Sequence, residues 1–426
     1  MDIDYLILDI MLYDVAIIGG GPAGMMAAIR AGELGERVIL LEKTKRLGTK
    51  LLITGKGRCN ITNQTENDRE MIAAFGASGK FLFSALKKFG VEDVINFFGT
   101  SGVKTKVERG ARVFPESDQS RDVLDALLLN LKKSKVEIKL DSAVKEIIAK
   151  ENKIEKIKLF GGKEIIAEKY IIATGGKSYP GTGSTGDGYT WLDKLGHTIN
   201  ELSSALVPII IKEKIVAELE GLSLKNVEIS LYKDAKKIDS RFGEAIFTAD
   251  GMSGPIIIDM SGVIGKHLDG KLKLSIDFKP ALDYPTLDLR LQKDFTTQAK
   301  KLFKNSLDNL LPQKMIPVII NLSGIDPNKK VNLISREERK KLLHLLKEFS
   351  LTVKALGGYD HAIITAGGVA TSEVDPKTMQ SKIIANLFLA GEIIDLHGPT
   401  GGFNLQQCWS TGYAAGEGAS SSYLSS

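Results

Sequence analysis

The sequence predicts an α/β protein in which a split Rossmann-like domain is interrupted by a β-rich domain that carries a nested helical subdomain. Near the N-terminus an apolar run, a glycine-rich turn and a helix-spaced segment follow one another, and further glycine-rich turns stand near the C-terminus. Between them, alternating apolar runs give way to helical spacing and then return. We expect the split domain at 11–200 and 359–426, the β-rich domain at 201–284 and 348–358, and the helical subdomain at 285–347.

The composition is typical of a globular protein of two or three domains. The chain has 426 residues, of which 43% are hydrophobic and 26% are charged. No run of ~18 apolar residues predicts a membrane span, and MDIDYLILDIM has acids where a secretion signal needs basic residues. Two distant cysteines and five scattered histidines indicate no disulfide framework and no metal site. We therefore expect a cytoplasmic protein, with residues 1–10 an extension upstream of Met11.

The first sixty residues predict a strand–turn–helix–strand unit. YDVAII is typical of a buried parallel strand, MMAAIRAGELG has helical spacing, and RVILLEK predicts a second strand closing on Glu42. The turn GGGPAG contains G-x-G-x-x-G, whose glycines permit a tight turn, a close approach of a pyrophosphate and packing of helix on strand. The helix N-terminus favours phosphate charge, and Glu42 can bind a ribose diol. The unit predicts a dinucleotide site with contacts at Gly19, Gly21, Pro22, Ala23, Gly24 and Glu42.

The polar loop EKTKRLGTKLLITGKGRCNITN favours FAD over NAD as the dinucleotide. A nicotinamide-binding domain usually moves promptly into its next helix, whereas this loop is long and rich in glycine and cations. Its cations can meet phosphate or ribose, its glycines let backbone approach a flat ring, and its amides offer donors and acceptors. The expected cofactor contacts are Lys43, Lys50, Gly57, Arg58, Cys59 and Asn60.

Two later segments predict further flavin contacts. YIIATGG is a strand ending in a Gly-Gly turn, similar to the segment before the return crossing in flavoproteins with two dinucleotide-binding domains. In LAGEIIDLHGPTGGFN a Gly-Glu pair replaces the Gly-Asp pair that contacts the ribityl chain in many FAD proteins, and Gly-Gly-Phe opens a helix whose amides can face the ring or the pyrophosphate. The expected contacts are Thr174, Gly175, Gly391, Glu392, Gly401, Gly402, Phe403 and Asn404.

A second G-x-G-x-x-G, at Gly181, Gly183 and Gly186, does not predict a second dinucleotide site. No strand runs directly into it, and no strand with a terminal acid follows at the right distance. We interpret it as a glycine-rich loop beside the flavin.

These segments resemble the BaiN-like or aminoacetone-oxidase-like family of bacterial and archaeal FAD/NAD(P)-dependent oxidoreductases. The resemblance rests on GGGPAG, TGKGRCNITN, GGKSYPGTGSTGDGY, GEAIFTADGMSGP, TAGGV, EVDPKTMQSK and LAGEIIDLHGPTGGFNLQQCWSTG, which together span nearly the whole chain. It implies a split Rossmann-like FAD-binding domain with an inserted β-rich domain and a nested helical domain. The family commonly has histidine where this chain has Ala249, and an acidic D-G-x-x-G-G-Y-N where this chain has HGPTGGFN. No family role is transferred to those positions.

The middle of the chain predicts strands followed by helices. LVPIII, VEISLY, EAIFTA and KLKLSIDF favour antiparallel strands, and helical spacing then runs to Lys347, with Ser335 and Glu338 spaced as a capping box. Residues 285–347 hold 13 Lys+Arg and 6 Asp+Glu, a net +7 in a chain of net +5. This basic subdomain indicates either contact with an anionic macromolecule or a solvated helical surface.

Three residues are candidates for catalysis. Cys59 lacks a C-x-x-C partner, so we interpret it as a small packed residue near the flavin, with redox catalysis as the alternative. His397 and Asp395 lie in the final loop with Asn404, where one of them can pass a proton to a substrate. For His397 the alternative is a structural or cofactor-contact role.

The sequence predicts an FAD-dependent oxidoreductase that transfers a hydride between NAD(P)H and an unsaturated organic substrate. No second Rossmann unit is apparent, so the nicotinamide is expected to bind transiently. The substrate is either a small molecule or a base in ribosomal RNA, the latter with the basic subdomain touching phosphates. The alternatives are a flavin oxidase of a small amine or related metabolite that uses oxygen, and a non-catalytic flavin-bound sensor.

Overall fold

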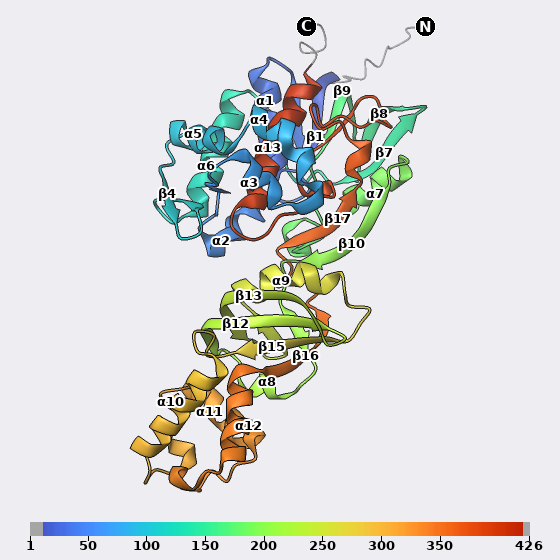
Figure 1. The fold of residues 1–426 in the computed structure, drawn as a ribbon. Coiled ribbons are helices and arrows are strands. Elements are labelled where there is room, and N and C mark those ends of the chain that lie inside the picture. The colour runs from blue at the N-terminus through green and yellow to red at the C-terminus, as the bar shows by residue number, and fades with distance from the viewer. Residues whose placement is uncertain (1–11, 421–426) are drawn as a thin grey trace, which may run out of the picture. The chain divides into compact units, whose positions relative to one another are not determined.

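The computed structural model describes residues 12–420, so the proposed extension at 1–10 lies outside the described residues. The chain forms two compact units, residues 1–203 with 363–426 and residues 204–362 (Figure 1). The first unit is therefore built from both ends of the chain. The predicted α/β class, with a Rossmann-like part and an inserted β-rich part, is confirmed.

The first unit is organised around one mixed sheet. In the described part of the chain its order is β6-β2-β1-β9-β8-β7, and β18 also pairs with β9. The pairs β1–β2, β2–β6, β1–β9 and β9–β18 are parallel, and the pairs β8–β9 and β7–β8 are antiparallel. The bounds are β1 Leu12–Ile18, β2 Val38–Leu41, β6 Glu137–Lys139, β7 Val144–Lys150, β8 Lys153–Leu159, β9 Glu164–Ile172 and β18 Leu387–Leu389.

Helices and two small sheets complete this unit. One small sheet has the order β3-β5-β4, and the other pairs β10 with β17. Their bounds are β3 Thr62–Asn63, β4 Thr105–Glu108, β5 Arg112–Pro115, β10 Ile199–Ala205 and β17 Ile364–Val369. The helices are α1 Pro22–Glu33, α2 Thr54–Gly57, α3 Asp68–Ala73, α4 Phe83–Lys88, α5 Val91–Thr100, α6 Ser120–Lys133, α7 Asp187–Lys194 and α13 Phe403–Ala419.

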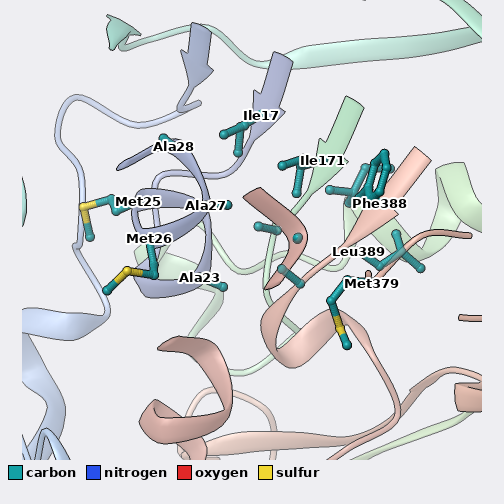
Figure 2. Close-up of a cluster of buried hydrophobic side chains, with 14 of the residues drawn as sticks. Ile17, Ala23, Met25, Met26, Ala27, Ala28, Ile171, Met379, Phe388 and Leu389 are labelled. Carbon is teal, nitrogen blue, oxygen red and sulfur yellow. The ribbon is translucent and has the colours of Figure 1, made fainter. Parts of the chain in front are cut away.

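The core of the first unit lies between the parallel strands and α1. Ile17 and Ile171 on β1 and β9 are fully buried, as are Met25 and Ala27 on α1 (Figure 2). Strands buried on both faces are expected to be continuously apolar, and VAII at 15–18 and YIIA at 170–173 follow this rule.

Helices α1 and α13 pack so closely that their backbones are in contact. A Cβ on Gly412 would lie 2.4 Å from the Ala23 carbonyl oxygen, and one on Gly416 would lie 2.4 Å from the Ala27 carbonyl oxygen. Since both residue numbers rise together, the two helices run in the same direction. Only glycine permits this approach.

The second unit contains a closed antiparallel barrel in the order β11-β14-β13-β12-β15-β16, which confirms the predicted antiparallel strands. Their bounds are β11 Ile209–Ile211, β12 Ser223–Lys233, β13 Lys236–Phe247, β14 Gly251–Ser253, β15 Leu272–Asp277 and β16 Phe349–Leu356. The helices are α8 Ile215–Glu218, α9 Pro255–Gly265, α10 Tyr284–Thr297, α11 Ile316–Ser323 and α12 Arg336–Lys347.

The predicted capping box at the start of α12 is confirmed. Glu338 N donates to Ser335 Oγ at 3.2 Å, and Ser335 N donates to Glu338 Oε2 at 2.7 Å. Among residues 12–420, none of the helices combines the length and apolar character that crossing a bilayer requires.

Candidate nucleotide-binding site

The glycine turn between β1 and α1 has one open position. Gly19 has φ +110°, and a Cβ there would lie 2.5 Å from the Ala173 carbonyl oxygen; a Cβ on Gly24 would lie 1.9 Å from the Gly19 carbonyl oxygen. Gly21 is different, because no described atom lies within 4 Å of the position its Cβ would take. The packing of the chain explains why Gly19 and Gly24 are glycines. Gly21, between them, leaves space that a ligand can fill, and Pro22 and Ala23 then begin α1.

Glu42 is fixed against this turn directly after β2. Its Oε2 accepts from Gly20 N at 2.8 Å, and its Oε1 accepts from Thr44 N at 2.8 Å. A carboxylate has about four acceptor sites. The backbone therefore orients Glu42 and leaves acceptor capacity for a hydroxyl pair.

The N-termini of α1 and α13 are staggered along one direction. The two helices meet where Gly412 contacts Ala23. From this contact, α13 extends nine residues back to its start at Phe403, whereas α1 extends one residue back to Pro22. The start of α13 therefore lies eight residues beyond the start of α1, ~12 Å at 1.5 Å per residue. Each N-terminus carries unpaired amides and partial positive charge. The pair suits a long ligand with two electron-rich groups.

The loop before α13 is held against β3. A Cβ on Gly402 would lie 2.3 Å from the Thr62 carbonyl oxygen, and a Cβ on Gly401 would lie 3.4 Å from Asn63 Nδ2. Both glycines have positive φ, +116° for Gly401 and +102° for Gly402. These contacts place the start of α13 beside the end of the TGKGRCNITN loop.

Two buried polar atoms at predicted contacts lack partners. Within residues 12–420, neither Asn60 Oδ1 nor Thr174 Oγ1 has a hydrogen bond. Buried polar atoms are nearly always paired. Thr174 follows β9, and its hydroxyl lies 2.3 Å from where a Gly188 Cβ would stand. Gly175, next in the chain, has φ +72°. The unpaired Asn60 carbonyl fits a donor supplied by a ligand.

The cations of the loop are paired within the protein. Lys43 Nζ lies 2.7 Å from Asp187 Oδ2, and Lys50 Nζ lies 2.9 Å from Glu392 Oε2. Arg58 Nη1 lies 2.8 Å from Glu108 Oε1 and 3.2 Å from Asp118 Oδ1. The hydrogen bond to Glu108 is the main cause that raises the pKa of Arg58. These cations tie the loop to distant segments before any ligand arrives.

The Glu392 carboxylate sits in a polar network. Besides Lys50, it accepts from Thr365 N at 2.7 Å and from Ser178 Oγ at 3.0 Å. Lys50 Nζ also donates to Ser178 Oγ at 2.6 Å. Sequence reasoning missed Ser178 and Thr365, because no spacing signal links partners 214 and 27 residues away from Glu392. Gly391, which begins the same turn, donates its amide to Thr411 Oγ1 on α13 at 2.9 Å.

Cys59 is placed as a packed thiol. It is fully buried with φ +62°, and burial raises its pKa to about 12 despite an opposing hydrogen bond with Thr54. Burial raises the pKa of Cys408 to about 12 as well, and the two thiols are unbonded. Because the thiolate is the nucleophile, this geometry disfavours redox catalysis by Cys59. Two residues before it, Gly57 has φ +84° and no described atom within 4 Å of its Cβ position.

The final loop, before α13, holds three polar residues predicted at the site. Asn404 clamps the loop: its Oδ1 accepts from Gly398 N at 2.9 Å, and its Nδ2 donates to the carbonyl oxygens of Gly398 and Pro399 at 2.9 and 3.1 Å. Asp395 Oδ2 accepts from Asn200 Nδ2 at 2.7 Å. Both side chains have structural partners. His397 is half-buried and stands directly before the clamped segment, and its role in proton transfer stays a prediction.

Comparison with known proteins identifies the family. The model of the HI0933-like protein Rossmann domain matches residues 13–418. The chain belongs to the HI0933-like family. This result confirms the predicted resemblance and the assignment as a flavoprotein oxidoreductase with a Rossmann nucleotide-binding fold.

Two relatives of this HI0933-like protein match nearly end to end. A 3-dehydro-bile acid delta(4,6)-reductase of Clostridium scindens is 33% identical over 415 residues, covering 95% of this chain and 98% of the relative. A ribosomal RNA dihydrouridine synthase of Escherichia coli is 29% identical over 405 residues, covering 95% and 97%. A solved 3-ketosteroid delta1-dehydrogenase from Sterolibacterium denitrificans shares the fold, with TM-score 0.53 at 13% identity, over 96% of this chain and 100% of that chain.

Proposed function

We propose that the chain is an FAD-dependent oxidoreductase that uses NAD(P)H to reduce a carbon–carbon double bond in an organic substrate. The observation that carries the proposal is the open space at Gly21 beside two staggered helix N-termini. The relatives support it, since one is named a delta(4,6)-reductase and the other a synthase of dihydrouridine, a base in its reduced form.

The residues of the site fit FAD as follows. The α1 N-terminus and Gly21 would hold the pyrophosphate, and Glu42 would hold the adenosine ribose. The α13 N-terminus, with Gly401, Gly402 and Phe403, would face the ring system. FAD supplies the redox chemistry once bound.

The protein contributes placement and charge. Fixed amides at the start of α13 favour negative charge that develops on a group bound there, since they need no reorganisation. Asn404 holds the loop that presents His397, and we assign His397 to proton delivery to the substrate. The Lys50–Ser178–Glu392 network positions the loop and the Gly391 turn relative to each other.

The substrate class can be tested separately from the electron donor. The protein would be reduced anaerobically with dithionite and mixed with a conjugated steroid ketone, a ribosomal RNA fragment, or buffer. Rapid reoxidation by either acceptor, with product confirmed by mass, would support the reductase and name its substrate class. Reoxidation only by oxygen, with stoichiometric hydrogen peroxide, would contradict the reductase and favour the oxidase.

A further inference from the structure

An open cavity lies in the surface of the second unit, where β12 and β15 part. The ladder between these strands ends at Glu228↔Asp277, so residues 223–227 of β12 have β13 beside them but not β15. Residues 308–312, between α10 and α11, form the opposite wall. The cavity is open to solvent, and its volume of about 370 Å³ lies in the range of small-ligand sites.

The lining of this cavity is divided by chemistry. The apolar lining comprises Leu224, Val227, Phe278, Leu310, Leu311 and Pro312. The charged lining comprises Lys225, Lys279 and Asp308. Such a combination suits an organic anion, with its apolar part against the aliphatic wall and its charge at the lysines.

Lys279 is the distinctive group. It is half-buried, and within residues 12–420 its ammonium group forms no ion pair or hydrogen bond. Burial, then the nearby Arg290 guanidinium, lowers the pKa of Lys279. By contrast, the neighbouring Lys347 has its ammonium 2.5 Å from Asp277 Oδ2. A cation removed from water without a partner is costly, so an anion bound at Lys279 would relieve that cost.

The surrounding charges favour an anion on balance. Lys225 is exposed and also lacks an ion pair within the described residues. Arg290 lies behind the wall: its Nη2 donates to the Asn309 carbonyl oxygen at 3.2 Å, and its Nε lies 3.7 Å from Asp294 Oδ2. Asp308 opposes them, although Gln313 Nε2 donates to its Oδ1 at 2.8 Å.

We propose that this cavity binds a phosphate group of a nucleotide, with Lys279 and Lys225 as its cationic ligands and the base against the apolar wall. The site goes beyond the proposed redox function, because every residue that lines it belongs to the second unit. The phosphate can belong to a free nucleotide or to an RNA strand, and the chemistry of recognition is the same.

The test measures binding of three probes to the flavin-loaded protein: inorganic phosphate, uridine 5′-monophosphate and a fluorescent single-stranded oligouridylate. Lys279→Met is the principal variant, and it should fold because it removes an unpaired, half-buried charge. Lys301→Met is the matched control, since Lys301 is an exposed lysine of the same unit that does not line the cavity. Asp308→Asn removes the opposing carboxylate.

We expect Lys279→Met to weaken nucleotide binding about tenfold, as for loss of one charge-assisted hydrogen bond. Lys301→Met should leave it unchanged, and Asp308→Asn should strengthen it. Binding of the mononucleotide as tight as that of the oligomer would assign the phosphate to a free nucleotide, and much tighter oligomer binding would assign it to RNA. Equal loss in Lys279→Met and Lys301→Met, or no binding of any probe by wild type, would overturn the proposal. An unchanged flavin spectrum in the variants keeps this outcome separate from the redox function.

Discussion

Ala23 and Gly412 hold α1 and α13 so close that a Cβ on Gly412 would lie 2.4 Å from the Ala23 carbonyl oxygen. This contact sets the register of the two helices. The register in turn places the two N-termini ~12 Å apart along the helix direction. The proposed cofactor site therefore depends on a residue that would not itself touch the cofactor.

The first prediction concerns that contact. Gly412→Ala should destabilise the protein by roughly 1–3 kcal/mol, because a methyl group meets backbone that cannot move aside easily. Gly99→Ala on α5 is the control, since no described atom lies within 4 Å of its Cβ position. Alanine favours helix over glycine, so this control should stabilise by up to about 1 kcal/mol. Urea unfolding measures both, and equal effects of the same sign would refute the packing argument.

The second prediction concerns the open position in the glycine turn. Gly21→Val should lose most bound flavin, because its side chain occupies the space assigned to the pyrophosphate. Its apoprotein should unfold at nearly the same urea concentration as wild-type apoprotein, since no described atom lies within 4 Å of the added Cβ. Flavin absorbance per protein measures the first effect. A fully yellow variant would show that the pyrophosphate binds elsewhere.

The third prediction concerns pH and the buried His197. Its Nε2 lies 3.0 Å from Ser381 Oγ, and its Nδ1 lies 3.2 Å from Glu373 Oε2. Ser381 Oγ also accepts from the amides of Ile383 and Ile384, so its proton is directed at a neutral imidazole. Burial lowers the pKa of His197, against the opposing influence of Glu373.

A lowered pKa makes the unfolded chain bind more protons than the folded protein just below the usual histidine pKa of about 6.5. Stability should therefore fall as pH drops through that value, by at most about 1.4 kcal/mol per pH unit from this group. His197→Gln should flatten the profile of unfolding free energy between pH 7.5 and 5.5. His361→Gln, at an exposed position, should not change the slope. Identical slopes for wild type and His197→Gln would contradict the assignment.

The fourth prediction concerns the thiols. Since burial raises the pKa of both Cys59 and Cys408 to about 12, neither should react with a disulfide reagent at pH 7.5 until the protein unfolds. Cys59→Ala should keep turnover within a few-fold of wild type. Rapid labelling of one thiol in the native protein, or loss of turnover with flavin retained, would revive a redox role for Cys59.

Local patterns made part of this protein predictable. The Gly19–Gly24 turn, the apolar strand before it and the Ser335 capping box each depend on residues close in sequence, so the sequence specifies them directly. Pairings across the chain were not predictable. Lys43 and Arg58 pair with Asp187 and Glu108, carboxylates that only the fold brings near, whereas their predicted cofactor contacts stay predictions. The cavity beside the unpaired Lys279 was likewise not predictable, because it depends on where the β12–β15 pairing ends in the fold.

The central claim is that the chain binds FAD and receives electrons from a nicotinamide. The most direct measurement is to purify the protein, identify its flavin by mass, and follow anaerobic bleaching with NADH and NADPH. We predict FAD at near-stoichiometric content and bleaching by at least one of the two. Protein that binds NAD but no flavin, or FAD that neither nicotinamide bleaches, would contradict the account.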